Sequence, residues 1–276
     1  MIDSKLEEEI GQRHLLYCLR GSIAHGLYKP SMDEHGIDDI DWIGVFSAPV
    51  SYYYGLNKIE QYEQLPTKDN PNDIVSYEVK KFFRLLMKCN PNIFSLLWNE
   101  REFYKTITVA GQILIDHREE FLYTDGIYQA FSGYAYSQLQ KMQHGHREGY
   151  MGEKRKALVE RYGYDTKNAS HLVRLLTMGK EILETGKVKI FRDNDHQFLM
   201  DIKEGKYSLE EVKELAENGF SDLQNIREKS VLPSKIDYKK ADSLLQMVAS
   251  MCHHGNGLQF SFGSSNIGDI IGVAQR

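Results

Sequence analysis

Two aspartates, Asp39 and Asp41, stand two residues apart around the start of a mostly apolar run, Ile40 to Phe46. On a β-strand, side chains two apart point to the same face, so the two carboxylates would lie side by side. Like charges that close repel each other, and a divalent cation removes the repulsion. Carboxylate oxygens are hard ligands that select Mg²⁺ or Mn²⁺. The spacing therefore predicts a binding site for one of these metals.

A Gly-Ser pair, Gly21 and Ser22, precedes the aspartates and follows a short apolar run. Glycine lets the backbone of a strand-to-helix turn approach a ligand closely, and its N–H groups together with a hydroxyl can bind phosphate oxygens. His25 and Lys29 follow the turn and are candidates for the same phosphates, with a plain surface role as the alternative. Metal carboxylates facing a phosphate-binding turn are the parts of a nucleotidyl or phosphoryl transfer site.

Asp38 stands beside the aspartate pair. On a regular strand it points to the opposite face, so we expect it to be a turn or hydrogen-bonding residue.

The elements that would position these groups alternate between helix and strand in the first half of the chain. We expect helices at 4–13 and 78–88, and strands at 15–19, 40–46 and 73–77. The front half therefore reads as an α/β arrangement, in which short strands carry the carboxylates.

From about residue 126 the pattern is mostly helical. An apolar stripe predicts a helix over 166–185, which begins at Asp165 or Thr166 and ends at Gly186. Ser208 and Glu211 form a capping box that opens another helix, and Asn218-Gly219 would end it.

Three basic side chains, Lys167, His171 and Arg174, fall at helical spacing on the 166–185 segment, opposite its apolar stripe. Basic side chains can follow a phosphate backbone. We expect these residues to bind an RNA acceptor or the nucleotide, and a solvated helix face is the alternative.

The composition excludes several classes of protein. The 276 residues are 41% apolar and carry a net charge of −5, which excludes wholesale disorder and a generally cationic nucleic-acid coat. Three cysteines do not make a disulfide framework. The acidic start is unlike a signal peptide, and no apolar run approaches the ~18 residues of a membrane span. We expect a cytoplasmic protein, in the host cytoplasm if it is encoded by a phage.

The Gly-Ser pair followed by the Asp-x-Asp strand resembles the DNA polymerase β-type nucleotidyltransferase superfamily. The closer resemblance is to the predicted nucleotidyltransferases of bacteria and phages that are linked by similarity to RNA repair. The likeness continues through three further segments: DIVSYEVKKFF (73–83), CNPNIFSLLW (89–98) and GYDTKNASHLVRLL (163–176).

This resemblance implies an α+β fold, with a small mixed sheet and flanking helices followed by a mainly helical C-terminal domain. It also implies a third metal carboxylate on a neighbouring strand, which Asp73 matches, with Glu78 as the alternative. Two ions, Mg²⁺ or Mn²⁺, would bind at Asp39, Asp41 and Asp73, one gripping the triphosphate and one activating the acceptor hydroxyl. Gly21 and Ser22 would bind the departing phosphates.

The same resemblance implies transfer of a nucleoside monophosphate from ATP or another nucleoside triphosphate to an RNA end, such as that of a tRNA. Transfer to a protein or a small molecule, and a nucleotide- or RNA-binding module without catalysis, are the alternatives. We expect a catalytic domain at 1–125, a helical acceptor- or nucleotide-binding domain at 126–252 and a glycine-rich tail at 253–276. The preferred nucleotide and the oligomeric state stay open.

Overall fold

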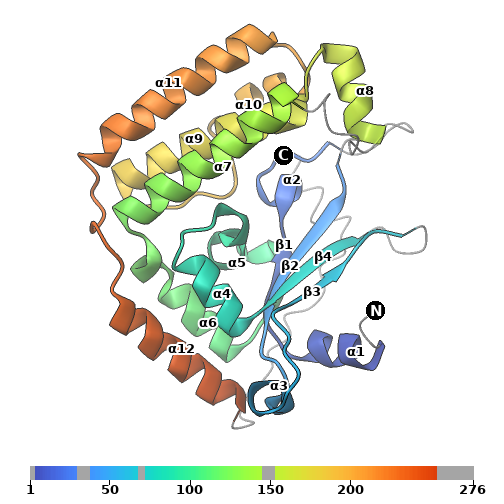
Figure 1. The fold of residues 1–276 in the computed structure, drawn as a ribbon, viewed down its shortest axis with the longest axis vertical. Helices are drawn as coiled ribbons and strands as arrows, with labels where there is room; N and C mark the ends of the chain where they lie inside the picture. Colours follow the sequence, from blue (N-terminus) through green and yellow to red (C-terminus); the bar gives the residue numbers. More distant parts are fainter. Residues whose placement is uncertain (1–3, 30–37, 68–71, 145–152, 254–276) are drawn as a thin grey trace. The chain divides into compact units, whose positions relative to one another are not determined.

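A computed structural model of the chain describes residues 4–29, 38–67, 72–144 and 153–253 (Figure 1). The chain divides into two compact units, which we call the sheet unit and the helical unit. The sheet unit comprises Met1–Tyr28, Asp39–Phe121 and Ile236–Arg276. The helical unit comprises Lys29–Asp38 and Leu122–Lys235.

The sheet unit is built on five strands in the order β3-β4-β2-β1-β5. Strands β2 and β4 are parallel, and the other neighbouring pairs are antiparallel, so the sheet is mixed as expected. The strands are β1 (His14–Leu19), β2 (Ile40–Phe46), β3 (Gln61–Gln64), β4 (Asn72–Glu78) and β5 (Tyr104–Ile107).

Short helices and 3₁₀ turns connect and cover these strands. The α-helices of this unit are α1 (Ser4–Gln12), α2 (Gly21–Ala24), α3 (Val50–Tyr54), α4 (Val79–Leu86), α5 (Ser95–Trp98), α6 (Val109–Asp116) and α12 (Tyr238–His253). The 3₁₀ turns are η1 (Pro91–Ile93), η2 (Arg101–Phe103) and η3 (Arg118–Phe121).

One face of the sheet is covered by α4, α5 and α6 (Figure 1). The thiol of Cys18 points to this face, where it lies 3.5 Å from the backbone carbonyl of Ser95 in α5. Ile43 pairs with Cys18 across β1 and β2 and therefore points the same way. Because side chains alternate along a strand, Asp41, two residues before Ile43, also belongs to this face.

The helical unit packs four helices around α9 (Thr166–Thr185). The four are α7 (Thr124–His144), α8 (Glu153–Tyr162), α10 (His196–Lys203) and α11 (Leu209–Arg227). The side chain of Asp165 caps α9 by accepting a hydrogen bond from the Asn168 N–H at 3.0 Å, and Gly186 ends the helix in the left-handed conformation. Both ends of α9 therefore lie where the sequence predicts them.

The predicted end of α11 is wrong. The capping box of Ser208 and Glu211 is formed, but the helix continues through Asn218-Gly219 to Arg227. Gly219 faces α9, where a Cβ atom would lie 2.9 Å from Cδ1 of Leu176. The glycine therefore allows α11 to approach α9 closely and does not terminate the helix.

The two units also differ from the predicted division into 1–125, 126–252 and 253–276. Helix α12 belongs with the sheet because it packs against α4, α6 and η3. Lys29 and Asp38 belong with the helical unit. The predicted tail at 253–276 lies, apart from its first residue, outside the described residues.

Among the described helices, none combines the length and the apolarity that crossing a bilayer requires. All three cysteines are free thiols.

His14 is a buried titratable group in the sheet. Its Nε2 lies 2.8 Å from the Ser76 hydroxyl, and its ring stacks on Tyr17 at a centroid distance of 4.7 Å. Burial lowers the pKa of His14 from 6.5 to about 4. Between these two values the unfolded chain binds a proton that the folded chain excludes, so His14 stabilises the fold above pH 6.5 and progressively less as the pH falls.

We expect the His14→Gln variant to lose this pH dependence. Linkage predicts that the wild type loses about 2.5 kcal/mol more unfolding free energy than the variant between pH 7.5 and pH 4.5. Urea denaturation of both proteins at the two pH values measures this difference. Equal losses in the two proteins would show that His14 is not held neutral in the folded state.

Candidate active site

Asp41 and Asp73 are partners across the parallel strands β2 and β4. Paired residues on neighbouring strands point to the same face, so the two carboxylates stand abreast at the start of their strands. Both side chains are half-buried. The structure thus brings two of the three predicted metal carboxylates together.

Asp39 lies just outside the strand that was expected to carry it. Strand β2 begins at Ile40, and Asp39 is an exposed residue in the segment leading into it. Within the described parts of the chain, no three His, Cys, Asp or Glu side chains are close enough to hold a metal ion together. Asp39, Asp41 and Asp73 are therefore not gathered into one three-carboxylate group.

Gly21 packs directly against the side chain of Asp41. Its φ angle is +66°, and a Cβ atom at this position would lie 2.3 Å from Oδ2 of Asp41. Only glycine fits this turn, because any side chain would collide with the carboxylate and would also strain the backbone. Ser22 follows as the second residue of the four-residue helix α2 and is half-buried. The predicted phosphate-binding turn and the predicted metal carboxylate are therefore neighbours.

The residue before this turn was not singled out from the sequence. Nη2 of Arg20 lies 3.4 Å from Oδ2 of Asp73, and both side chains are partly exposed. The backbone N–H of Arg20 donates to the carbonyl of Asp41 at 2.9 Å. The only sequence signal for Arg20 is its position directly before Gly21-Ser22, and its partner became visible only with the strand order.

Glu78, the alternative to Asp73, has a structural role. Its buried carboxylate caps α4 by accepting hydrogen bonds from the N–H groups of Lys80 and Lys81 at 2.9 and 3.3 Å. It also accepts a hydrogen bond from the Tyr53 hydroxyl at 2.5 Å. Glu78 pairs with Phe46 at the far end of β2 from Asp41. This position favours Asp73 as the third carboxylate.

The two other phosphate candidates are placed differently from each other. His25 is half-buried at the end of α2, where its N–H donates to the carbonyl of Gly21 at 3.2 Å. Lys29 belongs to the helical unit, and its ammonium pairs with Glu204 at 2.8 Å. His25 therefore stays near the Gly-Ser turn, whereas Lys29 already has a carboxylate partner.

Asp38 is buried in the helical unit between two lysines. Its carboxylate lies 2.5 Å from Nζ of Lys203 and 3.2 Å from Nζ of Lys167. It also accepts a hydrogen bond from the N–H of Lys29 at 2.9 Å. Burial alone would raise the pKa of Asp38, but the two ammonium groups hold it below its usual value. We call Asp38, Lys167 and Lys203 the buried ion cluster.

His171 and Arg174, the rest of the predicted basic stripe, are half-buried on α9. Burial, followed by the positive charges of neighbouring side chains, lowers the pKa of His171 well below its usual value. These neighbours are Arg174, Arg155, Lys141 and Lys167. The stripe is therefore partly enclosed, and two of the cations around its neutral histidine are paired with carboxylates, Lys167 with Asp38 and Arg155 with Asp165.

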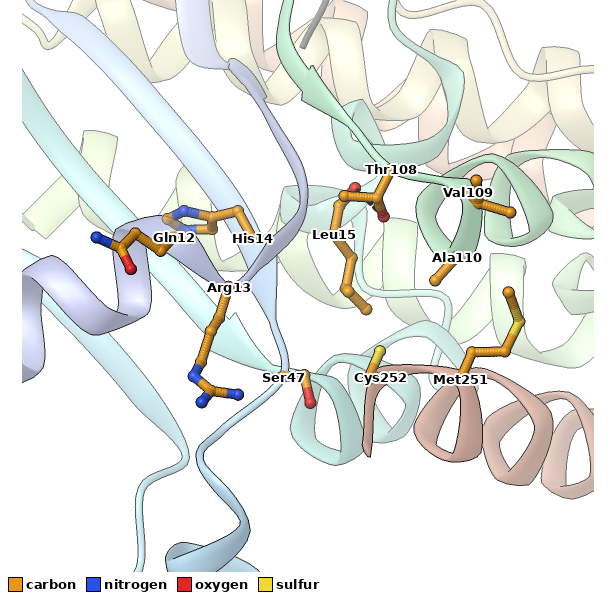
Figure 2. Close-up of a pocket in the computed structure, with 10 residues that line it drawn as sticks. All are labelled: Gln12, Arg13, His14, Leu15, Ser47, Thr108, Val109, Ala110, Met251 and Cys252. Atoms are coloured by element: carbon orange, nitrogen blue, oxygen red, sulfur yellow. Dashed lines mark hydrogen bonds between the residues drawn. The ribbon is translucent and has the colours of Figure 1, made fainter. Parts of the chain in front are cut away.

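A separate cavity of about 200 Å³ lies in the sheet unit, beyond the opposite end of β2 from Asp41 (Figure 2). Ser47, Leu15 and Ala110 line it together with Cys252 and Met251 of α12. None of the residues that the sequence singled out as site candidates lines this cavity.

Comparisons with known proteins point to one protein family. The model of the RNA repair pathway DNA polymerase beta family, RlaP, matches residues 4–247. A nucleotidyltransferase-like protein from Exiguobacterium sibiricum 255-15 matches with a TM-score of 0.28 and 12% identity, over 82% of this chain and 73% of that chain. No curated protein matches the chain.

Replacing Gly21 tests the contact with Asp41. Gly163 is a matched control, because its φ is +80° but nothing lies within 4 Å of a Cβ built there. We expect both alanine variants to lose about 1 kcal/mol of stability from backbone strain. Only Gly21→Ala should displace the Asp41 carboxylate and weaken Mn²⁺ binding, by about tenfold or more. Calorimetric titration with Mn²⁺ measures this, and equal affinities in the two variants would contradict the role of Gly21.

Replacing Lys203 tests the buried ion cluster. Lys203 and Asp38 are almost wholly buried, whereas the Lys29–Glu204 pair is partly exposed. Removing one partner of a buried pair leaves an uncompensated charge, and Lys167 relieves only part of it. We expect Lys203→Met to cost about 3 kcal/mol of unfolding free energy and Lys29→Met to cost less than about 1 kcal/mol. Urea denaturation of both variants measures the difference, and similar losses would show that the cluster is not stabilising.

Proposed function

Because the chain belongs to the RNA repair pathway DNA polymerase beta family, we propose that it transfers a nucleoside monophosphate from a nucleoside triphosphate to an acceptor hydroxyl. The observation that carries the proposal is the meeting of Gly21 with Asp41 beside Asp73. This arrangement places a turn suited to phosphate directly against paired carboxylates suited to a divalent cation.

The residues present fit Mg²⁺ or Mn²⁺. Asp41 and Asp73 supply hard oxygen donors from the same face of two paired strands, and Gly21 leaves room for the Asp41 carboxylate because it lacks a Cβ. Asp39 would complete the set from the segment before β2. When bound, the two ions of this family would neutralise phosphate charge and lower the pKa of the acceptor hydroxyl.

The chain's own groups would bind and orient the nucleotide. Gly21 and Ser22 offer backbone N–H groups and a hydroxyl to the β- and γ-phosphates, and His25 lies one helical turn further along. Because Lys29 is paired with Glu204, we assign it to the structure of the helical unit. ATP is the first donor to test, with the other three nucleotides beside it.

The acceptor that the charge pattern favours is the end of an RNA. In the helical unit, Lys167, His171 and Arg174 lie among further cations, Arg155 and Lys141. Lys167 and Arg155 of this group also pair with Asp38 and Asp165. The cations outnumber these carboxylates, and an excess of positive charge around a neutral histidine is suited to a polyphosphate backbone. We propose that this group of cations binds the RNA acceptor.

The decisive experiment uses α-labelled ATP, CTP, GTP and UTP with Mg²⁺ or Mn²⁺, and offers total RNA or lysate proteins as acceptors. We expect the wild type to label RNA, and Asp41→Asn to lower the rate by at least about a hundredfold because a charged oxygen ligand is lost. Asp116→Asn is the matched control, since Asp116 is an exposed residue at the end of α6.

Each outcome separates the alternatives. Label in protein would replace the RNA acceptor with a protein hydroxyl and leave the site assignment intact. An absence of label above Asp41→Asn, with all four nucleotides and an acceptor pool from the natural host, would overturn the catalytic proposal. Metal-dependent nucleotide binding without transfer would then identify a binding module.

A further inference from the structure

The pairing of β2 with β4 creates an electrostatic problem at the candidate site. Asp41 and Asp73 are register partners on the same face. Two carboxylates held abreast repel each other and favour any cation that can reach them. Within the sheet unit, the cation at Asp73 is the guanidinium of Arg20, with Nη2 3.4 Å from Oδ2.

The ion pair between Arg20 and Asp73 is long. At 3.4 Å a single Nη2 contact is longer than a charge-assisted hydrogen bond, which is usually below about 2.9 Å. Nε of Arg20 is buried and donates to no acceptor among the described residues. A buried donor without an acceptor is costly, so the guanidinium is not fully satisfied in this position.

The backbone of Arg20 is held in place beside Asp41. Its N–H donates to the carbonyl of Asp41 at 2.9 Å, and the next residue is Gly21, which closes against the Asp41 carboxylate. The guanidinium is therefore attached at a fixed point, one residue before the turn proposed to bind phosphates. Guanidinium groups bind phosphate oxygens through two parallel N–H donors.

We propose that Arg20 is an exchangeable counter-ion: it neutralises Asp73 until a divalent cation binds there, and its guanidinium then binds the phosphates of the nucleotide. This inference rests on the proposed function and adds a nucleotide-binding residue to it. The exchange gives the unsatisfied Nε an acceptor, and Asp73 is never left as an uncompensated charge. Metal and nucleotide binding are thereby coupled through one side chain.

The first arm of the test measures Mn²⁺ affinity without nucleotide, by electron paramagnetic resonance of the free ion. The proteins are the wild type, Arg20→Met, Asp73→Asn and the double variant. If Arg20 competes with the ion for Asp73, Arg20→Met should bind Mn²⁺ about fivefold more tightly than the wild type. The same substitution should have no effect in the Asp73→Asn background.

The second arm measures ATP affinity in the presence of saturating Mn²⁺, by calorimetry. Arg20→Met should bind ATP about tenfold more weakly, since it loses a bidentate phosphate ligand. Arg101→Met is the control for net charge, because Arg101 is exposed and its guanidinium donates to Gln112. It should change neither affinity. Circular dichroism checks that all variants are folded.

The outcomes separate this inference from the proposed function. Wild-type binding of Mn²⁺ and ATP with no change in folded Arg20→Met would overturn the role of Arg20 alone. Tighter Mn²⁺ binding that persists in the Asp73→Asn background would show a general charge effect and would also overturn it. Failure of the wild type to bind either Mn²⁺ or ATP would overturn the proposed function together with the inference.

Discussion

The repulsion between two carboxylates held abreast is the constraint on which the rest of the candidate site depends. The parallel pairing of β2 with β4 sets Asp41 beside Asp73, and neither strand can shift by one residue without turning its apolar side chains away from the core. A positive charge near the two carboxylates must therefore offset this repulsion. The sheet provides that charge from β1, whose last residue is followed directly by Arg20. Because β1 and β2 are antiparallel, the end of β1 lies beside the start of β2, and Arg20 is therefore placed near the two carboxylates.

The same register explains why the turn after β1 contains glycine. Leu19 pairs with Trp42, so the chain that leaves β1 passes directly over Asp41. A hydrogen bond from the N–H of Arg20 to the Asp41 carbonyl fixes this crossing. At such a distance a Cβ on Gly21 would occupy the position of the carboxylate oxygen. The Gly-Ser turn and the aspartates are thus parts of one packing arrangement, although some twenty residues separate them in the sequence.

The sequence predicted correctly the elements that are determined by residues close together in the chain. The prediction failed for features that depend on contacts between residues far apart in the chain. The strand at Ile40–Phe46 and the caps of α9 follow from short-range alternation and capping, and both are confirmed. The end of α11 was predicted wrongly. Gly219 packs closely against Leu176 of the neighbouring helix α9 and does not end α11. The importance of Arg20 was missed for the same reason, since its partner Asp73 lies on a strand that is not adjacent to β1 in the sheet. The candidate site residues themselves remain predictions that rest on the motif and on this geometry.

The aspartates at 38, 39 and 41 are close together in the sequence but have different surroundings. Asp38 is buried, and its charge is balanced by Lys203 and Lys167, so an added cation would meet two ammonium groups there. Asp39 is exposed, and Asp41 is half-buried against Gly21. The three aspartates therefore differ in their surroundings: Asp38 is paired with lysines inside the helical unit, Asp39 is exposed, and Asp41 lies half-buried against Gly21.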